Sequence, residues 1–83
     1  MIKRDIDVSL GGEGARPIAM MVQLASQFKS NIEIHQENMV VNAKSIMGMM
    51  TLGLVPGQKL EINVDGEDEE EAMNQMESFL SGK

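Results

Sequence analysis

Alternating apolar and polar residues predict a β-strand at the beginning of the chain. Between residues 2 and 10, Ile6, Val8 and Leu10 alternate with polar side chains. This is the two-residue period of a strand that buries one face. The segment Gly-Gly-Glu-Gly at 11–14 then interrupts the pattern, as a turn or loop would.

A first amphipathic helix is predicted after this loop. Pro17 suits the first turn of a helix, where its missing N–H group costs no hydrogen bond. Up to about residue 29, apolar side chains recur at helical spacing and form one apolar face. These side chains are Ile18, Met21, Val22, Ala25 and Phe28.

The middle of the chain is predicted to form a hairpin followed by a short helix. Residues 32–35 alternate Ile-Glu-Ile-His, a turn is expected at Glu37-Asn38, and a second strand runs through Val40 and Val41. Ser45 can cap a short helix that ends at about Leu52.

The last third predicts a turn, a strand and a helix. Pro56-Gly57 forms the turn, and the apolar residues of 60–64 alternate with polar ones. Asp68 followed by Glu71 resembles a capping box. The final helix takes its apolar face from Ala72, Met73, Met76, Phe79 and Leu80.

The predicted element order is βαββαβα, and each strand is polar on one face. Helices should therefore cover only the other face, which makes the chain an α+β protein. No linker or repeat divides its 83 residues, so we expect a single domain over 1–83. The periodicity alone also permits a ferredoxin-like arrangement of the same elements.

Composition excludes several classes of function. The chain has no cysteine, so disulfides, thiolate metal ligands and thiol nucleophiles are absent. Its net charge of −6 opposes direct binding to nucleic acid or an anionic membrane. No signal peptide or membrane span is recognisable, so we expect a cytoplasmic protein. The acidic run 67–71 lacks the ligand pattern of an EF-hand, and no catalytic triad, phosphate loop or metal cluster is found. We therefore expect neither an enzyme nor a bound cofactor or metal.

Two segments closely resemble the signature regions of the HPr family, the small phosphocarrier proteins of the sugar phosphotransferase system. They are GEGARPI at 12–18 and NAKSIMGMMTLG at 42–53, and their order and separation also fit. The resemblance implies an HPr-like open-faced β-sandwich, in which three helices cover one face of a four-stranded antiparallel sheet.

The first motif departs from the family pattern G-x-H-A-R-P, because Gly14 stands where the family has its phosphate-carrying histidine. Glycine offers no nucleophile for phosphate. Ala15 and Arg16 would remain as the remnant of an anion site, while the carboxylate of Glu13 opposes phosphate there. Family members of the Crh type also lack the histidine, with glutamine in its place, and act in carbon catabolite regulation. Two alternative explanations of Gly14 are that it is a neutral loop residue in a decayed gene product, or that it is an engineered substitution.

The second motif is intact, and the resemblance implies that HPr kinase/phosphorylase modifies its serine, Ser45. Without the resemblance, Ser45 is simply an N-cap, and most of the nine methionines are expected to fill the core. With it, an exposed docking patch is expected on the short helix, with Arg16 at its rim. The residues expected to contact partners are Arg16, Lys44, Ile46, Met47 and Met50.

His35 is the only histidine and thus the only substitute carrier. It alternates with Ile32 and Ile34, so it should face solvent on the open face of the sheet. No helix N-terminus or arginine is placed beside it by the sequence. We expect it not to accept phosphate.

Three functions compete at this point. The leading one is a regulator that is phosphorylated on Ser45 and acts as corepressor of a LacI-type catabolite control repressor. Other phosphotransferase-system proteins are further candidate partners. The second is a phosphocarrier, which Gly14 contradicts, and the third is an interaction module that is never phosphorylated.

Gly14 generates the first testable prediction. Incubation with phosphoenolpyruvate and Enzyme I should leave the protein unlabelled, whereas the Gly14→His variant should gain some acid-labile phosphate if the anion site is preserved. Phosphoenolpyruvate with a radioactive phosphoryl group measures both outcomes. Acid-labile phosphate on His35 of the unmodified chain would contradict the prediction.

Overall fold

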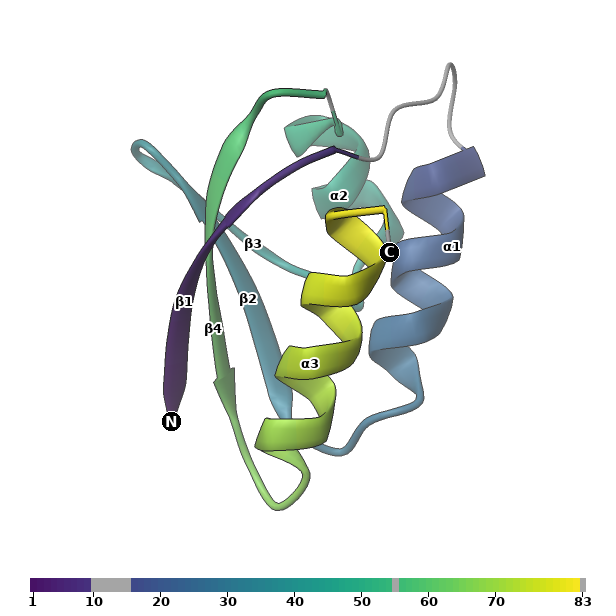
Figure 1. Ribbon diagram of the computed structural model, residues 1–83. Helices are drawn as coiled ribbons and strands as arrows, with labels where there is room; N and C mark the ends of the chain where they lie inside the picture. Colours follow the sequence, from purple (N-terminus) through teal and green to yellow (C-terminus); the bar gives the residue numbers. More distant parts are fainter. Residues whose placement is uncertain (10–15, 55, 83) are drawn as a thin grey trace.

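The computed structural model describes residues 1–9, 16–54 and 56–82, apart from the side chain of Arg16. Three helices cover one face of a four-stranded sheet and leave the other face uncovered (Figure 1). The predicted order βαββαβα is confirmed. In chain order the elements are β1 Ile2–Asp7, α1 Arg16–Ser26, β2 Asn31–Gln36, β3 Met39–Asn42, α2 Ile46–Leu52, β4 Lys59–Asp65 and α3 Glu69–Leu80.

The sheet has the order β1-β4-β2-β3, and all neighbouring strands are antiparallel. The register places Ile6 opposite Leu60 and Ile34 opposite Ile62, so apolar side chains line up on the face toward the helices. Because β1 and β2 both run antiparallel to β4, they are parallel to each other, and α1 is the crossover between them. This strand order decides the topology, which periodicity left open.

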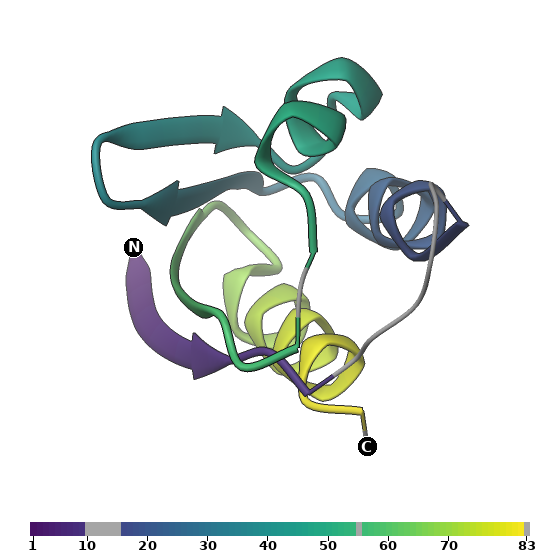
Figure 2. The same cartoon turned by 90° about the horizontal axis from the view of Figure 1, so that it is seen from above.

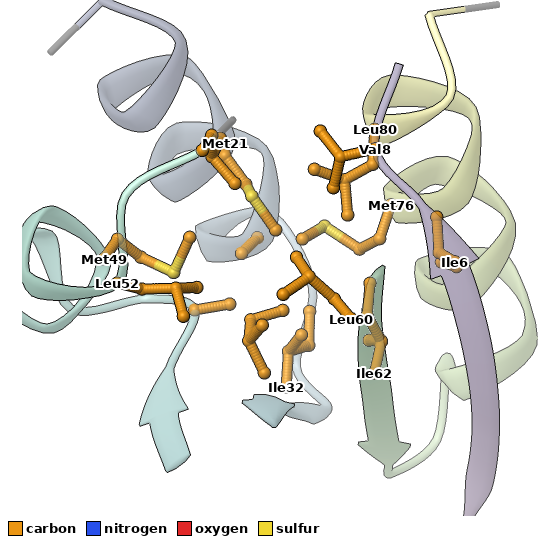
Figure 3. Packing of buried hydrophobic residues seen from close by; sticks show 14 of the residues in the cluster. Ile6, Val8, Met21, Ile32, Met49, Leu52, Leu60, Ile62, Met76 and Leu80 are labelled. Atoms are coloured by element: carbon orange, nitrogen blue, oxygen red, sulfur yellow. The ribbon is translucent and has the colours of Figure 1, made fainter. Parts of the chain in front are cut away.

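The core lies between the sheet and the three helices (Figure 3). Met21 of α1, Met49 of α2 and Met76 of α3 point into it from three different elements, and each is 0% exposed. With Met73, four of the nine methionines are buried, so the expectation that most of them fill the core is wrong. The reason is that a domain of this size has a small interior, and each helix turns only one stripe toward it.

The predicted capping box at Asp68 is also wrong. Asp68 is the N-cap of α3, but its side chain makes no cap hydrogen bond. Instead, its carboxylate accepts hydrogen bonds from the backbone N–H groups of Lys29, at 2.9 Å, and Ser30, at 3.0 Å, and from the Ser30 hydroxyl. The hydrogen bond from that hydroxyl is the main reason why the pKa of Asp68 falls to about 2.

The Asp68 carboxylate bonds to Lys29 and Ser30 because two loops approach each other closely. A Cβ atom on Gly66 would lie 2.6 Å from the Cα of Ser30, so only glycine lets the β4–α3 loop pack against the α1–β2 loop. The Asp68 carboxylate then satisfies donors of the opposite loop. The glutamate that bonds to the backbone before the helix is Glu69, not Glu71. Its Oε1 accepts from the Gly66 N–H at 3.2 Å.

Within the described ranges, none of the helices is long and apolar enough to cross a membrane.

The bonds to Asp68 predict how stability depends on pH. Since its pKa is about 2 in the folded chain against an ordinary 3.8, its stabilising contribution is fully present above about pH 4 and is lost as the pH falls toward 2. Asp68→Asn should lower the free energy of unfolding at pH 7 and flatten its pH dependence between about 4 and 2. Urea unfolding followed by circular dichroism at several pH values measures both.

Glu67→Gln is the matched control, because that carboxylate is 83% exposed and lies 3.9 Å from the Lys29 ammonium. This variant should keep the stability and acid profile of the unmodified protein. An acid profile that stays equally steep in Asp68→Asn would show that other carboxylates cause it.

Candidate phosphorylation site and docking surface

Ser45 lies at the turn between β3 and α2. The side-chain Oδ1 of Asn42 accepts from the Lys44 N–H at 2.8 Å, and the Asn42 carbonyl accepts from the Ser45 N–H at 2.9 Å. These bonds turn the chain as an Asx turn does. Ser45 then has extended backbone angles, φ −101° and ψ 115°, and its Oγ accepts from the Gly48 N–H at 3.2 Å. The predicted N-cap is confirmed.

The helix that follows Ser45 ends after seven residues. Gly53 stops it with a φ of 72°, a conformation that favours glycine, and its N–H donates to the Met49 carbonyl at 2.9 Å. A Cβ on Gly48 would lie 3.4 Å from the Cβ of Val41, so this turn of α2 lies close against β3. The position of α2 is therefore fixed by the Ser45 N-cap, the Gly53 C-cap and the close contact of Gly48 with β3.

Helix α2 is amphipathic, with Met49 and Leu52 facing the core. Its other side carries Ile46, Met47 and Met50, whose exposed fractions are 41%, 78% and 55%. We call these three residues the α2 patch. They are exposed, as predicted for a docking patch, and such a group of large apolar side chains on a surface is typical of a binding site.

Met20 is a further exposed apolar residue, outside the residues predicted to form the docking patch. It is 48% exposed on α1, and α1 packs against α2 (Figure 2). Its position could have been inferred, because the helical spacing of the buried face passes through Ile18 and Met21 and leaves residue 20 outside it.

Lys44, expected to contact partners, has a bond within the domain. Its Nζ donates to the carbonyl of Phe28 at 2.7 Å, and the residue is half-buried. This bond attaches the start of α2 to the connection between α1 and β2. Arg16 begins α1, but its side chain, and Gly14 and Ala15, lie outside the described residues.

His35 lies on the uncovered face of the sheet, as expected. It pairs with Val40 on one side and Glu61 on the other, and its Nε2 is 3.1 Å from Glu33 Oε1. It alternates along β2 with the buried Ile34, which faces the helices, and the three helices all lie on that other face of the sheet (Figure 1). The geometry therefore does not bring His35 and Ser45 into one site.

The arrangement of strands and helices places the chain in the class of small open-faced α+β sandwiches. The family model "PTS HPr component phosphorylation site" matches residues 6–81. The chain therefore belongs to the HPr family, which confirms the resemblance of its two motifs.

Similar proteins include both an HPr-like protein of the Crh type and a phosphocarrier protein HPr. The HPr-like protein Crh of Halalkalibacterium halodurans is 41% identical over 81 residues, which cover 96% of each chain. The phosphocarrier protein HPr of Treponema pallidum is 43% identical over 72 residues, covering 87% of this chain and 82% of that protein.

Two solved structures confirm the predicted fold class. HPr of Bacillus anthracis superposes with a TM-score of 0.90 at 38% identity, covering 96% of each chain. Crh of Bacillus subtilis, solved as a domain-swapped dimer, superposes with a TM-score of 0.76 at 37% identity, covering 96% of this chain and 93% of that one.

Because Met47 is exposed and Met21 is buried, replacing each by aspartate should have very different effects on the free energy of unfolding. Met47→Asp should change the free energy of unfolding by no more than about 0.5 kcal/mol, as is usual at surface positions. Met21→Asp should lower it by at least about 3 kcal/mol, because it removes core packing and buries a carboxyl group. Urea unfolding of both variants tests this, and a large loss in Met47→Asp would place Met47 in the core.

Proposed function

We propose that this protein is a regulatory member of the HPr family, phosphorylated on Ser45 by HPr kinase/phosphorylase and then acting as corepressor of a LacI-type catabolite control repressor. The observation that carries the proposal is the position of Ser45, a capping serine directly beside the exposed α2 patch. In this role the protein acts in the cytoplasm, as the substrate of an enzyme and the ligand of a repressor.

Phosphate transfer through a histidine is disfavoured by Gly14. A phosphocarrier needs an imidazole whose nitrogen attacks phosphate and readily releases it again. His35 does not replace it, because it alternates with the buried Ile34 on β2 and so faces away from the helices. The regulatory role needs no such group.

The Ser45 hydroxyl is suited to modification. It accepts one hydrogen bond, from the Gly48 N–H, and a hydroxyl has two acceptor lone pairs and one donor. Phosphorylation adds about −1.5 to −2 charges at pH 7, and a negative group at the start of a helix is stabilised by roughly 0.3–1 kcal/mol. We therefore expect α2 to keep its conformation and the phosphate to be recognised directly as new surface charge.

The α2 patch supplies the apolar half of the docking surface. Ile46 and Met50 are four residues apart on α2 and share one side of it, and Met47 is the most exposed of the three. Methionine side chains adapt to differently shaped partners. A repressor surface that offers basic groups to the phosphate and apolar side chains to this patch would contact both at once.

Contact with DNA belongs to the repressor in this proposal. The net charge of −6 makes binding of this chain to phosphate backbones unfavourable. Phosphorylation makes the chain more negative still, which strengthens attraction to a basic protein surface and weakens any attraction to DNA. Arg16 would contribute the opposite charge and pair with a carboxylate of the repressor.

The prediction is that HPr kinase/phosphorylase and ATP place one phosphate on Ser45, and that the product binds the repressor more tightly than the unmodified protein. Mass spectrometry locates the phosphate and calorimetry measures the affinity. Ser45→Ala should abolish phosphorylation. It also removes the cap, which costs about 0.5–2 kcal/mol of stability, so the assay is run well below the unfolding temperature.

Ser26→Ala is the matched control. Ser26 is exposed at the end of α1, whereas Ser45 is half-buried at the start of α2, and the Ser26 hydroxyl donates to the backbone carbonyl of Val22 at 2.8 Å. This variant should be phosphorylated like the unmodified protein. Arg16→Ala should weaken repressor binding without preventing phosphorylation, and added salt should weaken the charge-dependent part of the affinity.

Two results would overturn the proposal in different ways. Phosphate on another residue, or none, would remove Ser45 from the mechanism. Phosphate on Ser45 with unchanged repressor affinity would favour an interaction module that is not switched by phosphorylation.

A further inference from the structure

The sulfur atoms of this protein are divided between core and surface. Methionine is the only sulfur-containing residue, since the chain has no cysteine. Met21, Met49, Met73 and Met76 are 0% exposed. The two most exposed methionines after the amino-terminal one, Met47 at 78% and Met50 at 55%, both lie in the α2 patch.

We propose that Met47 and Met50 form an oxidation site, at which a peroxide converts their thioethers to sulfoxides and so prevents docking through the α2 patch. This inference rests on the proposed function, because it concerns the control of the same surface. It adds a second modification site, which acts in the opposite sense to phosphorylation of Ser45.

The chemistry needs only the side chain and the oxidant. A lone pair of the thioether sulfur attacks one oxygen of hydrogen peroxide, so that an S–O bond forms and the O–O bond breaks. The sulfur is oxidised by two electrons, and the other peroxide oxygen leaves as water after taking up the proton released from the oxygen transferred. Methionine sulfoxide reductases reverse the change.

The fold makes the reaction selective for one side of α2. Met47 and Met50 are three residues apart and lie on the same side of the helix. Met49 lies between them in the chain, yet its side chain points into the core, where Figure 3 shows it near Leu52. Peroxide should therefore oxidise Met47 and Met50 while the core remains packed and the domain stays folded.

The consequence for docking follows from polarity. A sulfoxide is a polar group on a side chain that is otherwise apolar. Transfer of such a group into an apolar interface without a hydrogen-bond partner costs enough free energy to weaken binding by about tenfold or more. Two adjacent sulfoxides on one helix side should weaken it further.

The experiment starts with the full chain phosphorylated on Ser45 and then treated with hydrogen peroxide for increasing times. Peptide mass spectrometry should show oxygen on Met47 and Met50 well before Met49, while circular dichroism stays unchanged. Affinity for the LacI-type repressor should fall at least about tenfold, and treatment with both methionine sulfoxide reductases should restore it. Unphosphorylated protein treated in parallel should become a poorer substrate of HPr kinase/phosphorylase.

The Met47→Leu/Met50→Leu double variant keeps an apolar α2 patch but has no thioether in it. Its affinity for the repressor, measured on the same variant before and after peroxide, should therefore not change on treatment. Met39→Leu is the matched control, since Met39 is 36% exposed on β3, outside the α2 patch. This variant should remain as sensitive to peroxide as the unmodified protein.

The two proposals fail in distinguishable ways. If the protein does not bind the repressor before oxidation, the proposed function fails, and the oxidation site falls with it. If the phosphorylated protein binds but keeps its affinity after Met47 and Met50 are oxidised, only the oxidation site is refuted. Oxidation of Met49 at the same rate as Met47 would also refute it, because the selectivity would be absent.

Discussion

Helix α2 has seven residues and is too short to be stable alone in water, so the candidate site depends on what holds this helix in place. Burial of Met49 and Leu52 anchors one side of it in the core. The Ser45 cap and the Gly53 stop satisfy backbone groups at its two ends. Because turning the helix would expose Met49, this anchoring keeps Met47 and Met50 on the solvent side.

The start of α2 is also linked to more distant parts of the chain through the connection between α1 and β2. On one side of this connection, the Lys44 ammonium donates to the Phe28 carbonyl. On the other, the Asp68 carboxylate accepts from the N–H groups of Lys29 and Ser30. Hydrogen bonds thus run from the N-cap of α3 to the residue that precedes Ser45, and three connections of the fold support the position of the serine.

The absence of the carrier histidine and the presence of the exposed α2 patch are both consistent with the proposed regulatory role. Phosphate transfer requires one particular nucleophile, and glycine at position 14 removes it completely. In the proposed role, docking requires only apolar area and a charge that phosphorylation changes, and the α2 patch and Ser45 would supply them. A small core adds to this, because methionines that the interior cannot hold enlarge the apolar surface of α1 and α2.

The sequence by itself determined the features that depend on neighbouring residues. Periods of two and of 3.6 residues located the strands and helices, and the cap by Ser45 was predictable because its partner, Gly48, is three residues away. The two motifs identified the family, showed the missing histidine and indicated the residues of the α2 patch.

Tertiary structure alone decided the interactions between residues that are distant in the chain. It set the strand order, it directed Asp68 to Lys29 and Ser30 and not to its own helix, and it engaged Lys44 with Phe28. It also selected which methionines are buried, because packing allows each helix only one inward stripe. Such partners depend on which elements come together in space, and a local pattern carries no information about that.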